Sequence, residues 1–196
     1  YNGISPEAPI CSGQSSAVLR LVMVARFARP KSPEDILKAL GILRNAEKRL
    51  LMQVDFIGNG ADLARVQRIA KELELKEAVR FLGNRTDVQT LLPHYDGFLL
   101  ISQWEGFPIS ILEAMRAGLP VIASRVGGGE EAITEGENGF LVPKGDIAAL
   151  ARKIHYAAKH REEFAAMGQK GRQRFLAQFT TEKMMAQLVK LYEACQ

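Results

Sequence analysis

The sequence predicts an α/β fold, a Rossmann-like domain in which helices cover both faces of a doubly wound parallel sheet. Two observations predict it. Short apolar runs rich in Val, Ile and Leu recur along the chain, and each has the length of a buried strand. Segments with apolar residues at helical spacing separate these runs, and the connections are short. Strands that alternate with helices in this way form parallel sheets, because each helix carries the chain back across the sheet.

The composition is that of a soluble globular protein long enough for one full α/β domain or two small ones. The 196 residues are 47% hydrophobic and 24% charged. A formal net charge of +4 and an isoelectric point near 9.1 weakly favour an anionic ligand. No block of consecutive basic residues occurs, so a nucleic-acid partner is not predicted.

Cysteine use and hydropathy predict a cytoplasmic protein. Cys11 and Cys195 lie near opposite ends of the chain, so a disulfide framework is not expected and a reducing compartment is. No apolar run reaches the roughly 18–20 residues that cross a bilayer. Residues 1–16 are polar and lack the apolar core of a signal peptide. The first residue is not methionine, which suggests a fragment or a processed form.

The first half of the chain is expected to hold a linker and three strands. Residues 1–17 are polar and predict a linker, and a strand at 19–25 opens the domain. Ser32 is expected to cap a helix at 33–46 that has Pro33 at its first position. The further strands are expected at 53–58 and 79–82, and the further helices at about 61–74 and 86–94.

The second half repeats the alternation. Apolar runs predict strands at 98–102, 121–123 and 139–142. Helical spacing predicts helices at about 108–117, 146–159, 161–177 and 180–194. The domain is therefore expected to span residues 18–177, and residues 178–196 to form a C-terminal helix.

The stretch from Phe98 to Met115 is the centre of the predicted site. A buried strand stops at Ser102, and a loop with Glu105 and Gly106 follows. Pro108 suits the first position of a helix, whose N–H has no helical partner. That helix should end at a left-handed Gly118. Strand, loop and helix N-terminus in this order form an anion site, since free N–H groups and the positive end of the helix dipole point beyond the sheet.

Several polar residues follow predicted strands and so should meet at the carboxyl edge of the sheet, where such folds bind ligands. These are Arg26, Lys31, Asn84, Glu105, Gly106 and Gly127. A pyrophosphate could be held by Arg26 and Lys31, by the close approach that Gly106 allows, and by the N–H groups of Phe107 and Ile109. Glu113, a carboxylate in an apolar setting, could accept both hydroxyls of a ribose. Glu105 lies where a sugar beyond the phosphates would sit.

Each of these residues also has an ordinary structural interpretation. Arg26, Lys31 and Glu105 could be solvated surface charges. Glu113 could pair with Arg116, and Gly127–Gly129 could be a plain flexible turn. The site interpretation is favoured because all of these elements converge on one edge of one predicted sheet.

The segment Glu105–Met115, EGFPISILEAM, resembles the paired-glutamate motif of the retaining GT-B glycosyltransferases of group 1, in which seven residues separate two glutamates. The resemblance covers nearly the whole chain, from Tyr1–Ile4, which is similar to the opening of that family's C-terminal domain, to the run at Asn138–Val142. The intermediate matches are Val24–Phe27 with Lys31, Phe56–Gly60, Val79–Gly83 and Ala117–Ala123. Ala25, Ser32, Pro108 and the Gly129–Glu130 pair depart from the family pattern in loops.

The resemblance implies the C-terminal half of a GT-B fold, a domain that binds a nucleotide-diphosphate sugar. Arg26 and Lys31 would take the diphosphate, Glu113 the ribose, and Glu105, the implied catalytic residue, the hydroxyls of the transferred sugar. The loop containing Asn84 and Arg85 would lie along the base. No metal cofactor is implied, and the acceptor would be a glycan or a lipid-linked molecule.

The resemblance also implies that an N-terminal acceptor domain is missing from this chain. The chain alone would then be folded but inactive, and its surface near Trp104 and Phe107 would be apolar because the missing domain covers it. The full-length protein would be cytoplasmic, with peripheral association at the inner face of a membrane as a further expectation.

Three other functions share features with this sequence. A dinucleotide oxidoreductase is disfavoured, because Leu63 stands where the third glycine after Gly58 and Gly60 should be. A non-catalytic nucleotide-binding module and a nucleotide-sugar epimerase both remain open. Metal-dependent transfer is not expected, since no Asp-x-Asp occurs and the histidines are scattered at positions 94, 155 and 160.

Overall fold

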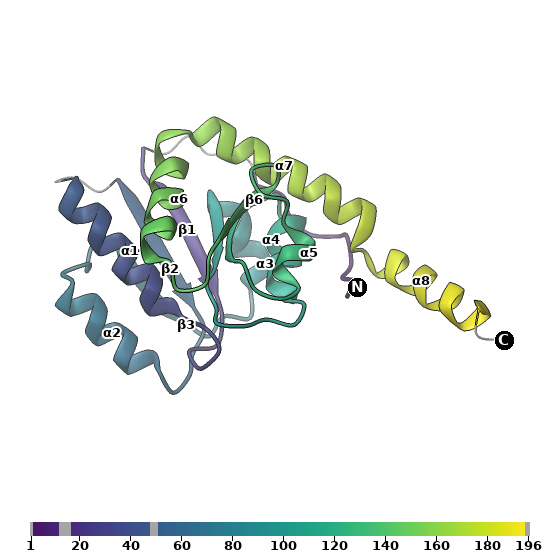
Figure 1. Ribbon diagram of the computed structural model, residues 1–196, viewed down its shortest axis with the longest axis horizontal. Coiled ribbons are helices and arrows are strands. Elements are labelled where there is room, and N and C mark those ends of the chain that lie inside the picture. The colour runs from purple at the N-terminus through teal and green to yellow at the C-terminus, as the bar shows by residue number, and fades with distance from the viewer. Residues whose placement is uncertain (1, 12–16, 48–50, 195–196) are drawn as a thin grey trace.

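A computed structural model describes residues 2–11, 17–47 and 51–194. In this part of the chain, six parallel strands form one sheet with the order β3-β2-β1-β4-β5-β6, covered by helices on both faces (Figure 1). The strands are β1 (Leu19–Val24), β2 (Met52–Ile57), β3 (Val79–Gly83), β4 (Gly97–Leu100), β5 (Val121–Ser124) and β6 (Gly139–Val142). The predicted Rossmann-like α/β fold is confirmed.

The strand order places a topological switch between β1 and β4. From β1 the chain builds outward through β2 and β3, then returns to build β4, β5 and β6 on the other side. β1 pairs with β4 through Leu21 opposite Gly97 and Val22 opposite Phe98. Because the two strands are parallel neighbours, the loops that follow them open side by side at the carboxyl edge, the usual ligand position in such sheets.

The helices divide between the two faces of the sheet, and those described are α1 (Pro33–Ala46), α2 (Leu63–Glu72), α3 (Val88–Leu91), α4 (Ile109–Arg116), α5 (Gly129–Ala132), α6 (Ile147–Lys159), α7 (Arg161–Gln178) and α8 (Thr181–Ala194), with a 3-10 turn at Leu92–His94. α1 packs against α2 and α6 on one face, whereas α4 packs against α5 and α7 on the other. The short α5 was not predicted, because the glycine run at Gly127–Gly129 that leads into it is typical of a loop.

Both faces of the sheet are buried. On β1, Leu21 and Met23 join the core beneath α1 and α6, while Val22 between them joins the core beneath α4. β4 alternates in the same way, with Leu99 on the first side and Phe98 on the second. A strand that is buried on both sides is apolar at most positions, which explains the continuous apolar runs in the sequence.

One charged network lies inside the sheet. Asp55 on β2 is only 1% exposed. Its carboxylate accepts two hydrogen bonds from Arg80, at 2.8 and 2.5 Å, and one from the Tyr95 hydroxyl at 2.7 Å. Burial and this bond to Asp55 raise the pKa of Tyr95 well above its usual range. A buried carboxylate is tolerated only when it is paired in this way, so the network fixes β2 to β3 and to the segment before β4.

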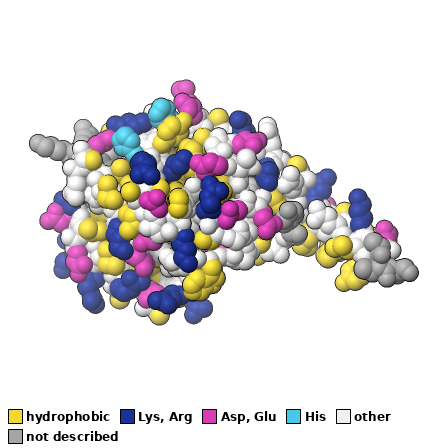
Figure 2. Space-filling view, viewed as in Figure 1, with side chains coloured by type: hydrophobic (Ala, Val, Ile, Leu, Met, Phe, Trp, Pro, Cys, Tyr) yellow, Lys and Arg dark blue, Asp and Glu magenta, His cyan; other side chains and the backbone are white. Residues whose placement is uncertain are grey.

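The N-terminal segment meets the junction between α7 and α8. The Ile4 N–H donates to the Phe179 carbonyl and the Thr181 N–H donates to the Ile4 carbonyl, both at 3.1 Å. From this point α8 projects away from the sheet (Figure 1) and exposes apolar side chains that are visible at its tip in Figure 2. The large hydrophobic side chains that α8 exposes are Met185, Leu188, Val189, Leu191 and Tyr192.

Three further expectations from the sequence concern the cysteines, membrane-spanning helices and surface charge. Cys11 is a free thiol, while Tyr1 and Cys195 lie outside the described residues. Within the described ranges, no helix has both the length and the apolar character needed to cross a bilayer. Figure 2 shows acidic and basic side chains interspersed over one face of the molecule. The domain limits and the cellular location stay predictions.

Candidate active site

The loops after β1 and β4 are joined to each other by hydrogen bonds. Lys31 and Ser102 form an isolated antiparallel bridge. On either side of it, the Ser32 N–H donates to the Ile101 carbonyl at 2.9 Å and the Gln103 N–H donates to the Pro30 carbonyl at 2.8 Å. The two loops therefore form one rigid unit at the switch point.

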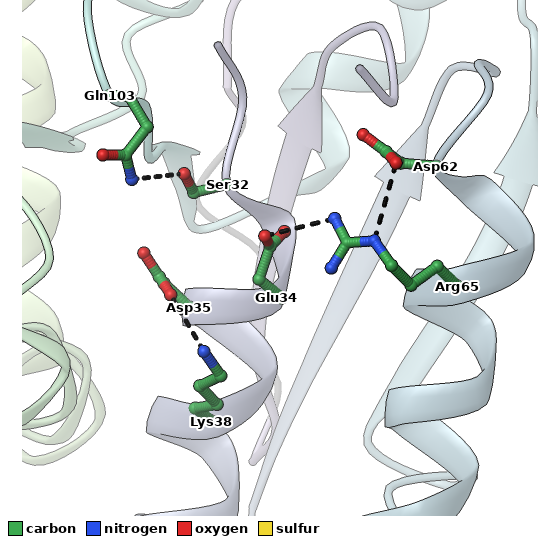
Figure 3. Close-up of polar contacts among 7 residues, drawn as sticks. All are labelled: Ser32, Glu34, Asp35, Lys38, Asp62, Arg65 and Gln103. Carbon is green, nitrogen blue, oxygen red and sulfur yellow. Dashed lines mark hydrogen bonds and ion pairs between the residues drawn. The ribbon is translucent and has the colours of Figure 1, made fainter. Parts of the chain in front are cut away.

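The Ser32 side chain takes part in this unit and does not act as the predicted helix cap. Ser32 stands at the N-cap position of α1, but its hydroxyl makes no capping hydrogen bond. It accepts a hydrogen bond of 2.8 Å from the Gln103 amide instead, as Figure 3 shows. The prediction was wrong because the partner, Gln103, is distant in sequence.

Lys31 and Glu105 form an ion pair at the centre of the unit. The side chains are 17% and 11% exposed. The Lys31 ammonium and the Ser102 hydroxyl both donate to the same carboxylate oxygen, Oε1 of Glu105. The other oxygen, Oε2, has no hydrogen-bond partner among the described residues. Glu105 is thus not a free surface charge, and one of its two carboxylate oxygens can still accept a hydrogen bond.

The loop after β5 supports the Glu105 loop through backbone contact. The Gly128 N–H donates to the Gly106 carbonyl at 2.6 Å. A Cβ on Gly127 would lie 1.9 Å from the Glu105 carbonyl oxygen, and a Cβ on Gly128 would lie 2.2 Å from the Gly106 oxygen. These glycines are needed for close approach and are not a plain flexible turn.

Helix α4 carries the second glutamate of the predicted site, Glu113. The helix starts at Ile109, with Pro108 at the N-cap and not at the predicted first helical position. It ends as predicted at Gly118, whose φ is +79°. The Glu113 side chain has no hydrogen bond or ion pair among the residues described, and burial raises the pKa of its carboxyl, partly offset by Arg116.

Arg116 does not neutralise Glu113 by direct contact. It is 4% exposed and donates to the Ser5 carbonyl at 3.0 Å. The alternative in which Glu113 simply pairs with this arginine is therefore wrong. A half-buried carboxylate without a donor is unfavourable unless a ligand supplies one.

Arg26 lies in a separate hollow at the carboxyl ends of β1, β2 and β3. The hollow has a volume of about 480 Å³, and it is lined by Arg26, Asn59, Asn84, Arg85 and Val88 together with the strand ends. Arg26 is exposed and makes no ion pair within the described chain. Arg85 is held by Asp87 at 2.8 and 2.6 Å. The structure thus brings Arg26 together with Asn84 and Arg85, while Lys31 stands beside Glu105.

The glycines at 58 and 60, which suggested a dinucleotide fingerprint, have a packing role. A Cβ on Gly58 would lie 2.0 Å from the Ala25 carbonyl oxygen, and a Cβ on Gly60 would lie 2.3 Å from the Phe27 carbonyl oxygen. They let the loops after β1 and β2 lie against each other.

The residues beyond Gly106 form the outer rim of the site. The Phe107 ring lies 5.5 Å from the Phe179 ring, and Gly106 and Phe107 line a groove of about 490 Å³ beside α8. Trp104 is 55% exposed and Ile109 is exposed as well, so the rim carries the expected apolar surface except at Phe107, which is half-buried.

A larger hollow of about 940 Å³ lies at the other end of the sheet. It is lined by Arg20, Arg44, Lys71 and Lys76, among others, near the amino ends of β1 and β2. Parallel α/β sheets bind ligands at their carboxyl ends, so the smaller carboxyl-edge site is the stronger candidate.

Comparison with known proteins gives the family. The family model described as "Glycosyl transferases group 1" matches residues 15–174. The chain belongs to this family. Among curated relatives, the N-acetyl-α-D-glucosaminyl L-malate synthase of Bacillus anthracis is 32% identical over 181 residues, covering 92% of this chain and 46% of the relative. The D-inositol 3-phosphate glycosyltransferase of Corynebacterium urealyticum is 31% identical over 178 residues, covering 87% and 42%.

Solved glycosyltransferases of the GT-B type share the fold. The crystal structure of Anabaena HepE in complex with UDP and glucose superposes with a TM-score of 0.87 at 22% identity, covering 98% of this chain and 55% of that one. This group 1 glycosyltransferase chain therefore spans about half the length of the relatives it matches.

Three supporting residues of the site were not predicted from the sequence. Ser102 and Gln103 hold the Glu105 loop from the end of β4, and Gly128 holds it from the loop after β5. Ser102 could have been recognised as a small polar residue at the end of a buried strand. Nothing in the sequence distinguishes Gly128 from the glycines beside it.

Proposed function

We propose that this chain is the donor-binding half of a retaining glycosyltransferase, which binds a nucleotide-diphosphate sugar for transfer to a glycan or lipid-linked acceptor. The observation that carries the proposal is the Lys31–Glu105 pair at the switch point between β1 and β4. A cation for a diphosphate and a carboxylate with a free oxygen for a sugar hydroxyl stand side by side there. HepE, whose structure was solved in complex with UDP and glucose, supports the same class of ligand.

The proposed donor extends along the carboxyl edge. Lys31 and Arg26 bind the diphosphate, and Gly106 allows an oxygen to approach the backbone because nothing lies within 4 Å of its Cβ position. The N-terminus of α4, at Ile109 next to Phe107, adds the positive end of a helix dipole. The positive charge for the leaving diphosphate then comes from the protein, so we expect no metal cofactor.

The nucleoside and the sugar occupy opposite sides of the diphosphate. Glu113 accepts the ribose hydroxyls, which supply the donors that its half-buried carboxylate lacks. The base lies in the hollow with Asn84 and Arg85. On the other side, Glu105 accepts hydroxyls of the transferred sugar through its free Oε2. Retention requires the acceptor to attack from the face that the diphosphate leaves.

The other half of the reaction cleft belongs to a part of the protein outside this chain. The chain covers 46% of its Bacillus anthracis relative, so the acceptor site is proposed to lie in the remaining part. Bringing donor and acceptor together then requires closure of the two halves, with Trp104 and Ile109 on the facing surface.

A ligand panel tests the proposal. Nucleoside diphosphates of all common bases, their sugar conjugates and the matching nucleosides are added to this chain, and the melting temperature is measured. One diphosphate series should raise it, and the nucleosides should raise it least. If no diphosphate stabilises the folded chain, the proposed function is wrong.

A turnover assay separates the remaining alternatives. The chain alone should transfer no sugar, while the full-length protein with donor and an acceptor extract should release nucleoside diphosphate and extend an acceptor. Conversion of the donor to a different nucleotide-sugar would indicate an epimerase. Binding of the donor to the full-length protein without any turnover would indicate a non-catalytic module.

A further inference from the structure

We infer that the Lys31–Glu105 ion pair is a lock that the donor opens. In the free protein the Lys31 ammonium, which the diphosphate needs, is paired with Glu105. When the diphosphate binds, Lys31 leaves Glu105 and pairs with a phosphate oxygen. The exchange removes one of the two donors on Oε1 of Glu105, so the carboxylate can accept the sugar hydroxyls more strongly, and it couples sugar recognition to diphosphate binding. The inference rests on the proposed function and goes beyond it, because it says that the site is self-inhibited when empty.

Lys31 has one anionic partner. Within the described residues, Glu105 is the only carboxylate that forms an ion pair with Lys31. The acidic residues at the start of α1 are committed elsewhere, as Figure 3 shows. Glu34 pairs with Arg65 at 3.2 Å and Asp35 with Lys38 at 3.5 Å. Lys31 therefore has no second carboxylate to hold it when Glu105 is displaced.

The geometry of the pair forces a competition between Glu105 and a phosphate. Lys31 and Glu105 are both largely withdrawn from solvent, at 17% and 11% exposure. A phosphate that contacts Lys31 must come close to the carboxylate, and two anions on one ammonium repel each other. Because a diphosphate carries more negative charge than one carboxylate, it displaces Glu105 from the Lys31 ammonium.

Ser102 keeps Glu105 in place after the exchange. Its hydroxyl donates to Oε1 of Glu105, and its N–H donates to the Ser124 hydroxyl at 3.0 Å. Ser102 and Ser124 are buried on adjacent strand ends, so this anchor is rigid. When Lys31 leaves, Glu105 is held by a neutral donor and stays where a sugar hydroxyl can reach it. Ser102 is thus a positioning residue for Glu105.

Removal of the carboxylate should have an effect that is unusual for a residue in a binding site. Glu105→Gln should bind a nucleoside diphosphate more tightly than the wild type, because the lock is gone. For an ion pair that is only partly exposed, we expect a gain of about three- to tenfold. The same variant should lose the extra affinity that the wild type has for the intact nucleotide-sugar over the diphosphate.

A double-mutant cycle measured by calorimetry separates exchange from simple repulsion by Glu105. UDP is the first probe, with GDP and ADP alongside it. The four proteins are the wild type, Glu105→Gln, Lys31→Met and the double variant. If UDP displaces Glu105 from Lys31, the gain in UDP affinity caused by Glu105→Gln depends on Lys31. That gain should be at least about three times larger in the protein with Lys31 than in the Lys31→Met background. Equal gains in the two backgrounds overturn the inference.

The matched control is Glu74→Gln, which removes the same charge from an exposed carboxylate paired with Arg44 at 2.5 Å, beyond the C-terminal end of α2. It should leave UDP affinity unchanged. All variants are checked for wild-type far-UV and near-UV circular dichroism, so that a folding defect is recognised.

The outcomes distinguish the two claims. If Lys31→Met weakens UDP binding and Glu105→Gln leaves it unchanged or weaker, the lock is wrong while the donor site stands. If no nucleoside diphosphate binds the folded wild type or the folded Glu105→Gln variant, the proposed function itself is wrong.

Discussion

Lys31 and Glu105 are 74 positions apart in the sequence, yet their side chains form an ion pair at the one place in the sheet where the chain reverses its direction of growth. The pair exists because β1 and β4 are parallel neighbours and their exit loops are joined by the Lys31–Ser102 bridge. The same contact marks the candidate donor site, and in it Glu105 competes with the diphosphate for Lys31.

Arg26→Ala should weaken binding of a nucleoside diphosphate by about tenfold or more, because hydrogen bonds to charged groups contribute about 1.5–3 kcal/mol. Binding of the matching nucleoside should hardly change. Calorimetry with both ligands checks this, and Arg68→Ala on the exposed face of α2 is the matched control. Equal losses for diphosphate and nucleoside would show that Arg26 does not bind phosphate.

Glu113→Gln should weaken nucleotide binding about tenfold while making the free protein more stable at neutral pH. Burial raises the pKa of this carboxyl in the folded protein. A raised carboxyl pKa means that stability falls as pH rises from about 4.3, the unfolded value, through the folded value.

The melting temperature of Glu113→Gln should therefore exceed that of the wild type at pH 7, and the difference should vanish near pH 4. Glu137→Gln, on an exposed side chain, should change neither quantity. Unchanged stability at pH 7 would mean that Glu113 has a partner in the free protein after all.

Gly128→Ala should destabilise the protein and displace the Glu105 loop, because its Cβ would lie 2.2 Å from the Gly106 carbonyl oxygen. Overpacking of this kind costs about 1–3 kcal/mol. Gly106→Ala is the control in the same contact, since nothing lies within 4 Å of its Cβ position. It should leave the unfolding midpoint in urea near the wild-type value and still weaken diphosphate binding. If the two variants unfold alike, close packing of the two loops does not stabilise the site.

Tyr95→Phe should lower the free energy of unfolding by about 1.5–3 kcal/mol, because it removes a hydrogen bond to the buried Asp55 carboxylate. Tyr156→Phe makes the same change at a hydroxyl that donates to the exposed Glu163. That variant should stay within about 0.5 kcal/mol of the wild type. Urea denaturation of both proteins tests whether burial of the carboxylate decides the cost.

The strands and the long helices are predictable from the sequence for a physical reason. A strand buried on both faces leaves a continuous apolar run, as at Phe98–Ile101, and its register is fixed by two cores at once. Gly118 was predictable as a helix end because a left-handed position favours glycine. Element limits shifted by only one or two residues in most places, as at Pro108.

The contacts that assemble the site could not be predicted in the same way. The hydrogen bond of Ser32 to Gln103 and the pairing of Lys31 with Glu105 depend on how two loops meet, which no local periodicity records. The network of Asp55, Arg80 and Tyr95 was missed for the same reason. Residue types at strand ends indicated which side chains gather at the edge, but not which of them bond to each other.

The most direct test of the donor site is to map nucleoside diphosphate binding on the isotope-labelled chain by nuclear magnetic resonance. We expect the shifting amides to belong to the carboxyl-edge loops, around Arg26–Lys31, Asn84 and Glu105–Glu113. The hollow near Arg20, Arg44 and Lys71 should stay unchanged. Shifts confined to that amino-edge hollow would contradict the assignment of the donor site to the switch between β1 and β4.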